Sequence, residues 1–441
     1  MRDPQQVLNA LCVHSKDSGY RYERLYRILF NEKMFFIAYQ RKYANQGNMT
    51  PGTDDKTVDR MSIDRIQKLV ASLRDESYQP HPARRVYIPK KNGKKRPLGI
   101  PSFEDKLVQE VVHMILEAIY EGHFEDTSHG FRPGRSCHTA LRDIKVTFKG
   151  TRWFIEGDIK GFFDNIDHAT MIDILRERIS DERFLRLIRK FLNAGYIENW
   201  TYNNTYSGTP QGGIISPILA NIYLDKFDKY IKEYAENFNK GKGRRLTCEY
   251  QRNRNQRNAL RWKLEDETDE NRKAELKSKI ARLRKQMLDI PATRDMDDMF
   301  KRLKYIRYAD DFLIGVIGSK EECERIKVDI TTFMREKLKL EMSQEKTLIT
   351  NAQEPAKFLG YEIMARRSMD HRHTRCGLQR RSWLGTIVLK VSYETVLKRL
   401  QSYDAVRITQ VNRKETLKPS SRKYMVNRQD ADILAQYNLE L

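Results

Sequence analysis

Residues 304–316 read Lys-Tyr-Ile-Arg-Tyr-Ala-Asp-Asp-Phe-Leu-Ile-Gly-Val. Two runs rich in β-branched and aromatic residues meet at a short acidic segment, which predicts a β-hairpin with Asp310 and Asp311 at its tip. Adjacent like charges repel each other, so the pair indicates a bound cation that neutralises them. A solvated Asp-Asp turn is the alternative that this segment leaves open when it is considered alone.

A third carboxylate, Asp158, ends a predicted strand at residues 153–158, far earlier in the chain. Only a shared sheet would bring it to the hairpin tip, and adjacent central strands would make the three side chains converge. Three carboxylates around two divalent ions roughly 3.5 to 4 Å apart are the arrangement that two-metal phosphoryl transfer requires. Magnesium suits such all-oxygen ligation. The glycine-rich segment 208–217 lies between the two strands and would let the backbone approach a base or sugar closely.

Composition points to nucleic acid as the partner. The chain has 82 Lys and Arg against 60 Asp and Glu, a formal net charge of +22, which exceeds what solubility requires. An anionic membrane surface is the rival partner, but no apolar run approaches the roughly 18 to 20 residues of a membrane-spanning helix. Five scattered cysteines fit a reducing compartment, and the amino terminus lacks the pattern of a signal peptide, so a cytoplasmic location is expected. Residues 371–376 contain His, His and Cys, and a basic surface loop is favoured there over a metal site.

Periodicity predicts the remaining elements. Helical spacing occurs over residues 20–80, two strands at 85–89 and 97–101 flank a basic turn at 90–96, and amphipathic helices are expected at 107–120 and 171–192. Residues 241–287 are dense in both charge signs, and the stripe Leu276, Ile280, Leu283 and Met287 predicts a helical insertion, with a helical hairpin as one form of it. Its basic face would bind RNA or would simply be solvated, and periodicity alone does not decide between the two.

Taken in order, these motifs resemble those of a reverse transcriptase encoded by a bacterial group II intron, over nearly the whole chain. The matching segments are Asp158 with Phe162-Phe163, Pro210-Gln211-Gly212 with Ser216-Pro217, Tyr308-Ala309-Asp310-Asp311, Gln344-Glu345-Lys346-Thr347 and Phe358-Leu359-Gly360-Tyr361. Residues 129–133 and the charged insertion are similar to features of organellar-type group II enzymes. The resemblance implies an α+β fold of right-hand polymerase form, with fingers made of helices and a hairpin and a palm built on an antiparallel sheet.

The resemblance also implies roles for individual residues. The expected catalytic carboxylates are Asp158, Asp310 and Asp311, and with the backbone carbonyl of Ile159 they are the expected ligands of two Mg²⁺ ions, for which Mn²⁺ is a substitute. The expected nucleotide-binding residues are Lys90 and Arg96 on the triphosphate, Gln211 in the nucleotide pocket, Lys346 as proton donor to pyrophosphate and Phe163 as the steric gate against a ribose 2′-hydroxyl. The expected primer and template contacts are Arg132, Gly212, Gly213, Leu359 and Gly360. Core packing is the alternative for Phe163, as it is for the neighbouring Phe162.

We expect four regions along the chain. They are an amino-terminal extension with the helical part of the fingers (1–80), the rest of the fingers (81–150), the palm (151–370) and a linker with the start of a thumb or maturase region (371–441). The palm includes a return to the fingers near 195–215 and the charged insertion at about 238–302. Family proteins continue through a helical thumb, so most of that region is expected to be missing after Leu441.

The expected function is RNA-directed DNA polymerisation, copying intron RNA into complementary DNA for retrohoming, with help to splicing from intron RNA binding in the full-length protein. The partners would be an RNA template, a DNA primer, deoxynucleoside triphosphates and group II intron RNA, and not a membrane, with the nucleoid as a site of association in the bacterial cytoplasm. An RNA-dependent RNA polymerase is an alternative, against which Phe163 argues. A splicing cofactor with a vestigial site is another, against which the intact carboxylates argue. Nothing in the sequence indicates an oligomeric state.

Overall fold

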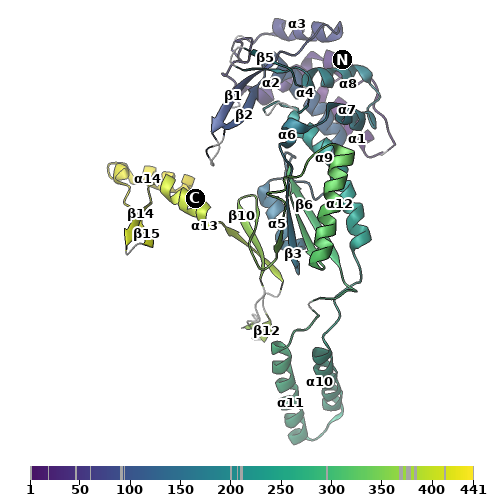
Figure 1. Cartoon of the computed structure of the whole chain (residues 1–441), viewed down its shortest axis with the longest axis vertical. Coiled ribbons are helices and arrows are strands. Elements are labelled where there is room, and N and C mark those ends of the chain that lie inside the picture. Colours follow the sequence, from purple (N-terminus) through teal and green to yellow (C-terminus); the bar gives the residue numbers. More distant parts are fainter. Residues whose placement is uncertain are drawn as a thin grey trace.

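The molecule has a helical part at one end, which we call the fingers, a central sheet, which we call the palm, a protruding pair of helices at the far end of the palm, and carboxy-terminal elements to one side of it (Figure 1). The computed structural model describes residues 2–17, 19–44, 47–59, 61–89, 93, 95–198, 201–205, 207–208, 212–294, 296–366, 371–373, 379–381, 385–411 and 414–440. Mixed helices and sheets in this arrangement confirm the predicted α+β fold.

The palm sheet has four antiparallel strands in the order β6-β7-β3-β8. Their bounds are β3 Trp153–Asp158, β6 Arg302–Tyr308, β7 Asp311–Ile317 and β8 Leu348–Asn351. Tyr308 pairs with Asp311, so Ala309 and Asp310 form a two-residue turn, and the predicted hairpin and the predicted strand at 153–158 are both confirmed.

Side chains of the palm sheet alternate between two apolar layers, as the pleat of a strand requires. Phe312, Ile314 and Val316 of β7 pack in the core that contains α9 (Ser216–Phe238) and α12 (Lys320–Leu338). Leu313 lies on the opposite face, in the core beneath α5 (Cys137–Thr147) and the adjoining strand pair β10–β13. Both faces of the sheet are therefore covered, and the ends of β3 and β7 lead to the carboxylates.

The fingers are organised around α4 (Phe103–Tyr120), of which thirteen of the eighteen residues are buried. Around it lie α1 Pro4–Ser15, η1 Tyr26–Phe30, α2 Glu32–Tyr43, α3 Ile63–Arg74, η2 Glu121–His123, α6 Phe162–Asn165, α7 His168–Arg176 and α8 Glu182–Leu192. A sheet in the order β2-β1-β4-β5 completes the fingers, with β1 Ala83–Pro89, β2 Lys95–Ile100, β4 Tyr196–Glu198 and β5 Thr201–Asn203. The helix predicted at 107–120 is confirmed. In the region 20–80, where helical spacing was predicted, η1, α2 and α3 are helical and the other described residues are not.

Two predicted boundaries in the fingers are wrong. The second hairpin strand begins at Lys95, so Arg96 lies on β2 opposite Ile88 rather than in the turn. The single helix predicted at 171–192 is two helices, α7 and α8. Ile179 leaves the helix to pair with Tyr22, and the side chain of Asp181 then accepts hydrogen bonds from the first amides of α8.

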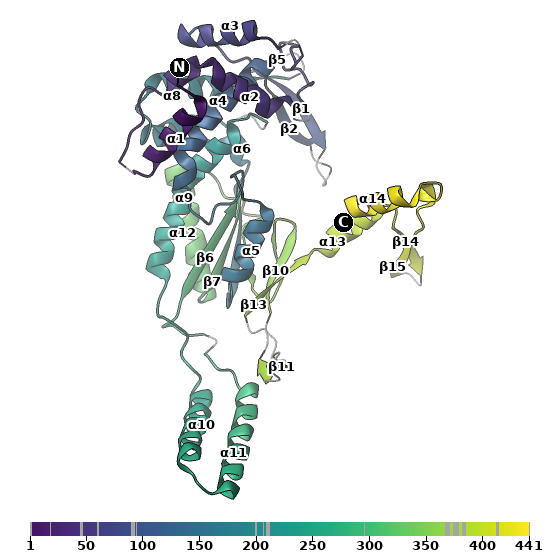
Figure 2. The same ribbon diagram turned by 180° about the vertical axis from the view of Figure 1, so that it is seen from behind.

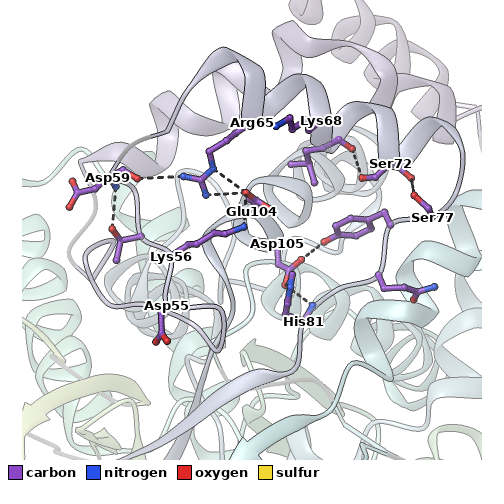
Figure 3. Close-up of a pocket in the computed structure, with 14 residues that line it drawn as sticks. Asp55, Lys56, Asp59, Arg65, Lys68, Ser72, Ser77, His81, Glu104 and Asp105 are labelled. Atoms are coloured by element: carbon purple, nitrogen blue, oxygen red, sulfur yellow. Dashed lines mark hydrogen bonds and ion pairs between the residues drawn. The ribbon is translucent and has the colours of Figure 1, made fainter.

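A polar hollow of about 970 Å³ lies between α3 and the start of α4 (Figure 3). Its side chains are tied to one another: the Tyr78 hydroxyl donates to Asp105, and Arg65 Nη2 donates to Glu104 Oε1 at 3.0 Å. Lys56, from the loop at residues 47–59, also pairs with Glu104 at 3.6 Å. These contacts hold the loop against α4, and we assign the hollow a structural role.

The predicted charged insertion is a helical hairpin, which we call the arm. It consists of α10 (Cys248–Asp266) and α11 (Glu270–Asp289), and it extends from the end of the palm opposite the fingers in both views (Figures 1 and 2). The predicted stripe on α11 is half-buried or buried against α10. The arm is otherwise exposed, with Met287 as its one buried residue.

The carboxy-terminal elements begin with a three-stranded sheet in the order β13-β10-β9 that adjoins the palm. The elements are β9 Ala356–Phe358, β10 Tyr361–Arg366, β11 His371–His373, β12 Gln379–Arg381, β13 Thr386–Val391, α13 Tyr393–Ser402, β14 Val406–Val411, β15 Lys414–Pro419, η3 Lys423–Met425 and α14 Asp430–Glu440. No helix among the described residues is long and apolar enough to cross a membrane.

Candidate functional site

The three carboxylates meet at one end of the palm sheet. Asp158, the last residue of β3, pairs directly with Asp311, the first residue of β7, and Asp310 precedes it in the turn. The convergence predicted from the sequence is therefore present, because β3 and β7 are neighbours in the sheet.

Electrostatics at this end of the sheet disfavour full ionisation of the carboxylates. Burial, together with the charges of Asp310 and Asp158, raises the pKa of Asp311 to about 7. The pKa of Asp310 is also raised, first by burial and then by Asp158, while Arg96 and Lys346 act in the opposite direction. The cluster thus has a deficit of positive charge, which a cation would fill.

Lys346 supplies part of that positive charge. Its Nζ donates to Asp158 Oδ2 at 2.7 Å, and this hydrogen bond raises the pKa of Lys346. The contact is built by the backbone, because Ser343 N donates to Asp158 O at 2.9 Å and so brings the turn at 343–347 to the end of β3. Lys346 is therefore a held, protonated ammonium beside the carboxylates.

The donor set fits a hard divalent cation that shares its coordination with a substrate. Among the residues that the structure describes, no group of three or more His, Cys, Asp or Glu is arranged to hold a metal ion unaided. All-oxygen ligands that leave positions for phosphate oxygens are the usual environment of Mg²⁺. The carbonyl oxygen of Ile159 takes no part in the backbone hydrogen bonds that join this segment to residues 341–343. Those bonds are formed by Lys160 N, which donates to Glu341 O, and by Asp158 O, which accepts from Ser343 N.

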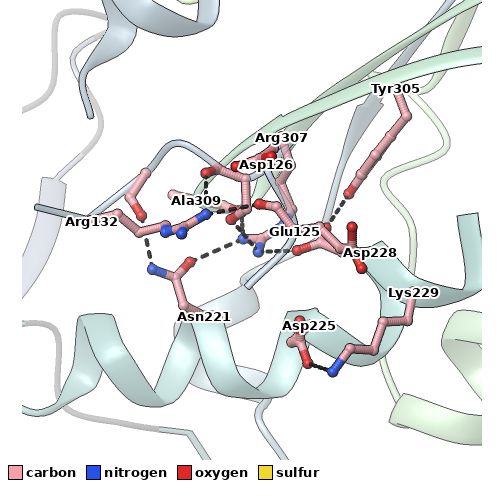
Figure 4. A network of polar contacts seen from close by, with 12 residues as sticks. Glu125, Asp126, Arg132, Asn221, Asp225, Asp228, Lys229, Tyr305, Arg307 and Ala309 are labelled. Atoms are coloured by element: carbon pink, nitrogen blue, oxygen red, sulfur yellow. Dashed lines mark hydrogen bonds and ion pairs between the residues drawn. The ribbon is translucent and has the colours of Figure 1, made fainter. Parts of the chain in front are cut away.

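A fully buried arginine, Arg307, is hydrogen-bonded to the turn that carries Asp310 (Figure 4). Arg307 Nε and Nη2 donate to the two oxygens of Asp228 on α9 at 2.7 and 2.6 Å. Arg307 Nη1 donates to Ala309 O at 2.9 Å and to Asn221 Oδ1 at 3.2 Å. Burial alone would lower the pKa of Arg307, but Asp228 raises it, so the pair is ionised.

The segment after α4 packs against the same turn. Asn221 Nδ2 donates to Gly130 O at 2.8 Å, and a Cβ at Gly130 would lie 2.3 Å from Ala309 N. Only glycine permits this approach, so residues 128–131 act as a backing for the turn. Ala309 has a φ of 56°, a conformation that is costly for a residue with a side chain, and the surrounding contacts hold it there.

The fingers contribute to the site through β2. The positive charge of Arg96 on β2 lowers the pKa of Asp310, against the effect of burial. Gly212, with a φ of 113°, abuts β2 so closely that a Cβ would lie 2.4 Å from Gly99 O, and Gln109 of α4 accepts a hydrogen bond from Ile214 N at 2.8 Å. Gly213 between them is buried. The described end of the glycine-rich segment is thus fixed between the fingers and α9.

Phe162 and Phe163 differ in their surroundings. Phe162 is 1% exposed and belongs to the core, as expected. Phe163 is half-buried at the start of α6, just after β3, and its ring meets Phe131 edge to face at 6.4 Å. Phe163 thus keeps part of its surface exposed while it packs against the core, whereas Phe162 does not.

The remaining candidate residues are distributed differently. Leu359 and Gly360 both have positive φ and form the turn between β9 and β10, whose position relative to β3 is set by Glu156, which accepts a hydrogen bond from Lys357 N at 2.8 Å. Arg132 is buried and its guanidinium is committed to Glu121 and to backbone carbonyls, an arrangement that favours a positioning role over a template contact. Lys90 and Gln211 lie outside the described residues.

Sequence reasoning missed the residues that support the carboxylates. They are Arg307, Asp228, Asn221, Gly130 and Glu156. One signal was available: Arg307 shares a strand face with Leu303 and Tyr305, and a cation at an inward position beside an acidic turn indicates a buried partner. Nothing in the sequence identifies Asp228 as that partner.

The sequence matches the family described as reverse transcriptase (RNA-dependent DNA polymerase) over residues 88–249 and 280–363. It is 46% identical to the group II intron-encoded protein LtrA of Lactococcus lactis, over all of this chain and 73% of that protein. An uncharacterised 91 kDa protein in the cob intron of Schizosaccharomyces pombe is 42% identical over 85% of this chain and 45% of its own length. Protein YkfC of Escherichia coli is 35% identical over 80% of this chain and 86% of its own length.

A pH dependence of stability follows from the raised pKa of Asp311. In the presence of a chelator, the melting temperature should fall as the pH rises from about 4 to about 7 and should then level off, because over this range the folded protein keeps a proton on Asp311 that the unfolded chain has lost. Asp311→Asn should remove most of this fall and should melt above the wild type at pH 8. Asp173→Asn, an exposed aspartate on α7, is the matched control. Parallel pH profiles for all three proteins would contradict the assignment.

A positioning role for Asn221 predicts a separation of kinetic constants. Asn221→Ala removes one bond to Arg307 and one to Gly130, so turnover should fall between about tenfold and a hundredfold while the KM for nucleotide stays constant. Lys226→Ala on the same helix, which breaks a solvent-exposed ion pair with Glu177, should leave both constants unchanged. If Asn221→Ala lowers only the melting temperature and not the turnover of the folded enzyme, the residue is structural alone.

Proposed function

The chain belongs to the reverse transcriptase family and, within it, to the proteins encoded by group II introns, and from this premise we propose that it copies intron RNA into DNA at Asp158, Asp310 and Asp311. The protein is thus an RNA-directed DNA polymerase. A single observation supports the assignment of the site. Two neighbouring strands of the palm sheet bring all three carboxylates together beside the side chain of Lys346, which donates a hydrogen bond to Asp158.

In the proposed reaction, the 3′-hydroxyl oxygen of a DNA primer attacks the α-phosphorus of a deoxynucleoside triphosphate. A phosphodiester bond forms, the bond to pyrophosphate breaks, and the hydroxyl proton is lost. Reverse transcriptases use divalent metal ions, and we propose two Mg²⁺ ions here, replaceable by Mn²⁺, which lower the pKa of the hydroxyl and neutralise the phosphates when bound. Asp158, Asp310, Asp311 and the carbonyl of Ile159 would hold them.

Two cationic side chains complete the proposed site. Arg96 on β2 is already within electrostatic range of Asp310, so a triphosphate seated between them would be gripped from the fingers side. Lys346 holds its proton next to Asp158, and it would donate this proton to the departing pyrophosphate. Lys90 and Gln211 stay predictions for the triphosphate and the nucleotide pocket, as Gly212, Gly213, Leu359 and Gly360 do for primer and template.

We propose group II intron RNA as the natural template and the cytoplasm as the place of action. Homology supports RNA and nucleotides as the substrate classes. Assistance to splicing is proposed as a second activity, because maturase proteins occur among the relatives. An RNA polymerase and a purely RNA-binding splicing cofactor are not favoured, since the carboxylate set and a ring at position 163 are both in place.

Primer extension tests the proposal directly. Asp310→Asn should reduce extension of a DNA primer on an RNA template by more than about a hundredfold, because the charge that binds the cation is lost while the shape is kept. RNA binding should stay unchanged, and Asp173→Asn should extend like the wild type. Extension by Asp310→Asn at the wild-type rate would remove this residue from the site.

Sugar selectivity tests Phe163. Phe163→Ala should raise the use of ribonucleotides relative to deoxynucleotides by about tenfold or more, because a ring no longer excludes the 2′-hydroxyl. Phe163→Tyr keeps the ring and should keep the selectivity. Competition between the two nucleotide types in one extension reaction measures the ratio, and a lower melting temperature with unaltered selectivity would assign Phe163 to core packing.

A further inference from the structure

Charge is segregated along the arm. Residues 251–263 and 276–287, which we call the shaft, each contain five Lys or Arg and no Asp or Glu. Residues 264–275, which we call the tip, contain six Asp or Glu and two Lys or Arg. The two halves of the shaft lie side by side in the hairpin, which gathers ten Lys and Arg on two neighbouring helices (Figures 1 and 2).

The cations of the shaft are not there to stabilise the arm. Among the described residues, Lys279 is the one shaft cation paired with a carboxylate, Glu275, at 2.6 Å. A helix that is stabilised by its own charges alternates the two signs at spacings of three or four residues. Elsewhere in the molecule such pairs are common, as at Lys226 with Glu177 and Lys232 with Glu125. Ten clustered cations, of which one is neutralised by a carboxylate, are complementary to an external polyanion.

An exposed tryptophan also belongs to the shaft. Trp262 is 69% exposed on α10, between Arg261 and Lys263. Asn258 and Asn255 precede it at spacings of four and seven residues, so they lie on the same side of the helix. Cations for phosphates, amides for base edges and an aromatic ring for stacking are the three kinds of group that bind RNA.

The location of the arm separates it from the polymerase site. The arm leaves the palm at the end opposite the fingers, and the family match stops at residue 249 and resumes at residue 280, which omits most of the arm. Its base is closed on itself, because Thr247 N donates to Ala292 O at 3.1 Å and Arg294 N donates to Arg245 O at 2.9 Å. RNA on the shaft is therefore distinct from the template at the carboxylates.

We propose that the arm is a second RNA-binding surface, whose shaft holds the phosphate backbone of a folded RNA while Trp262 stacks on an unpaired base. Unpaired bases in loops and bulges are what distinguishes folded RNA from duplex DNA as a ligand for such a surface. The acidic tip repels phosphate, so it confines the RNA to the shaft. The choice of RNA over another polyanion rests on the proposed function; the site itself rests on the charges and on Trp262.

Charge removal on α10 is the first test. The variant carries four exposed substitutions: Arg252→Gln, Arg254→Gln, Arg261→Gln and Lys263→Gln. Its affinity for an RNA stem-loop with an unpaired internal loop should fall at least about tenfold, and the slope of log affinity against log salt should decrease by up to about 3, since each lost phosphate contact removes about 0.7 to 0.9. These residues bury nothing in the arm, so folding is preserved.

A control of equal charge is available on the body of the protein. It carries Arg176→Gln, Arg186→Gln, Lys226→Gln and Lys232→Gln, all at exposed ion pairs. This control should bind the stem-loop like the wild type. Equal losses in both variants would mean that net charge alone attracts RNA, and unaltered binding in the arm variant would leave an acidic protein as the partner; either result overturns the proposal.

Trp262 gives a second and independent readout. Trp262→Ala should weaken stem-loop binding by about tenfold, the equivalent of one lost base stack, without changing the salt slope. Trp262→Phe should recover most of the affinity. Trp262→Ala should bind a fully paired RNA duplex like the wild type, and an equal loss on the duplex would contradict stacking on an unpaired base.

Extension of a primer on a short unstructured template separates this inference from the proposed function. Both arm variants should extend such a primer at the wild-type rate, because the template does not reach the arm. Normal extension with normal stem-loop binding in the arm variants would overturn the second surface and leave the polymerase assignment intact. If the wild-type protein binds the stem-loop through the arm but does not extend the primer, the polymerase assignment would be overturned and the second RNA-binding surface would stand.

Discussion

Arg307 and Asp228 form an ion pair that solvent does not reach. The turn at Ala309 and Asp310 supplies one of the hydrogen-bond acceptors that this buried arginine needs, the carbonyl oxygen of Ala309. A buried guanidinium is costly unless all five N–H groups find acceptors. Here all five do: two reach Asp228, and the others reach Ser128 Oγ, Asn221 Oδ1 and Ala309 O. Because the last three acceptors come from the segment after α4, from α9 and from the catalytic turn, one side chain fixes their relative positions.

The support is needed because the turn is unfavourable in itself. Ala309 adopts a left-handed conformation, and burial together with repulsion from the adjoining carboxylates raises the pKa of Asp311 to about 7. Left without neighbours, such a turn would relax toward a conformation that separates the charges. Burial of the Arg307 pair and the close approach of Gly130 prevent that relaxation, so stability from the core offsets strain at the site.

Sequence patterns predicted the elements whose signal is local. The strands at 153–158 and on both sides of Asp310-Asp311 are apolar runs bounded by charge, and the stripe on α11 has helical spacing, so each was recoverable without tertiary information. The break between α7 and α8 was not, because a parallel bridge from Tyr22 ends the helix. The sequence also did not reveal that the guanidinium of Arg132 is hydrogen-bonded inside the protein. Its acceptors are mostly backbone carbonyl oxygens, which have no sequence signature.

The net charge of +22 does not by itself locate an RNA site. On the body of the protein, many cations are neutralised by carboxylates a few ångströms away, as Arg307, Lys226 and Lys232 are. The arm differs, since its shaft collects cations and its tip collects carboxylates. A field of this kind acts over about one Debye length in physiological salt, roughly 8 Å, so it organises RNA along the arm without perturbing the carboxylates in the palm. An RNA-binding surface on a separate hairpin would let the protein retain one RNA while another is copied at the carboxylates.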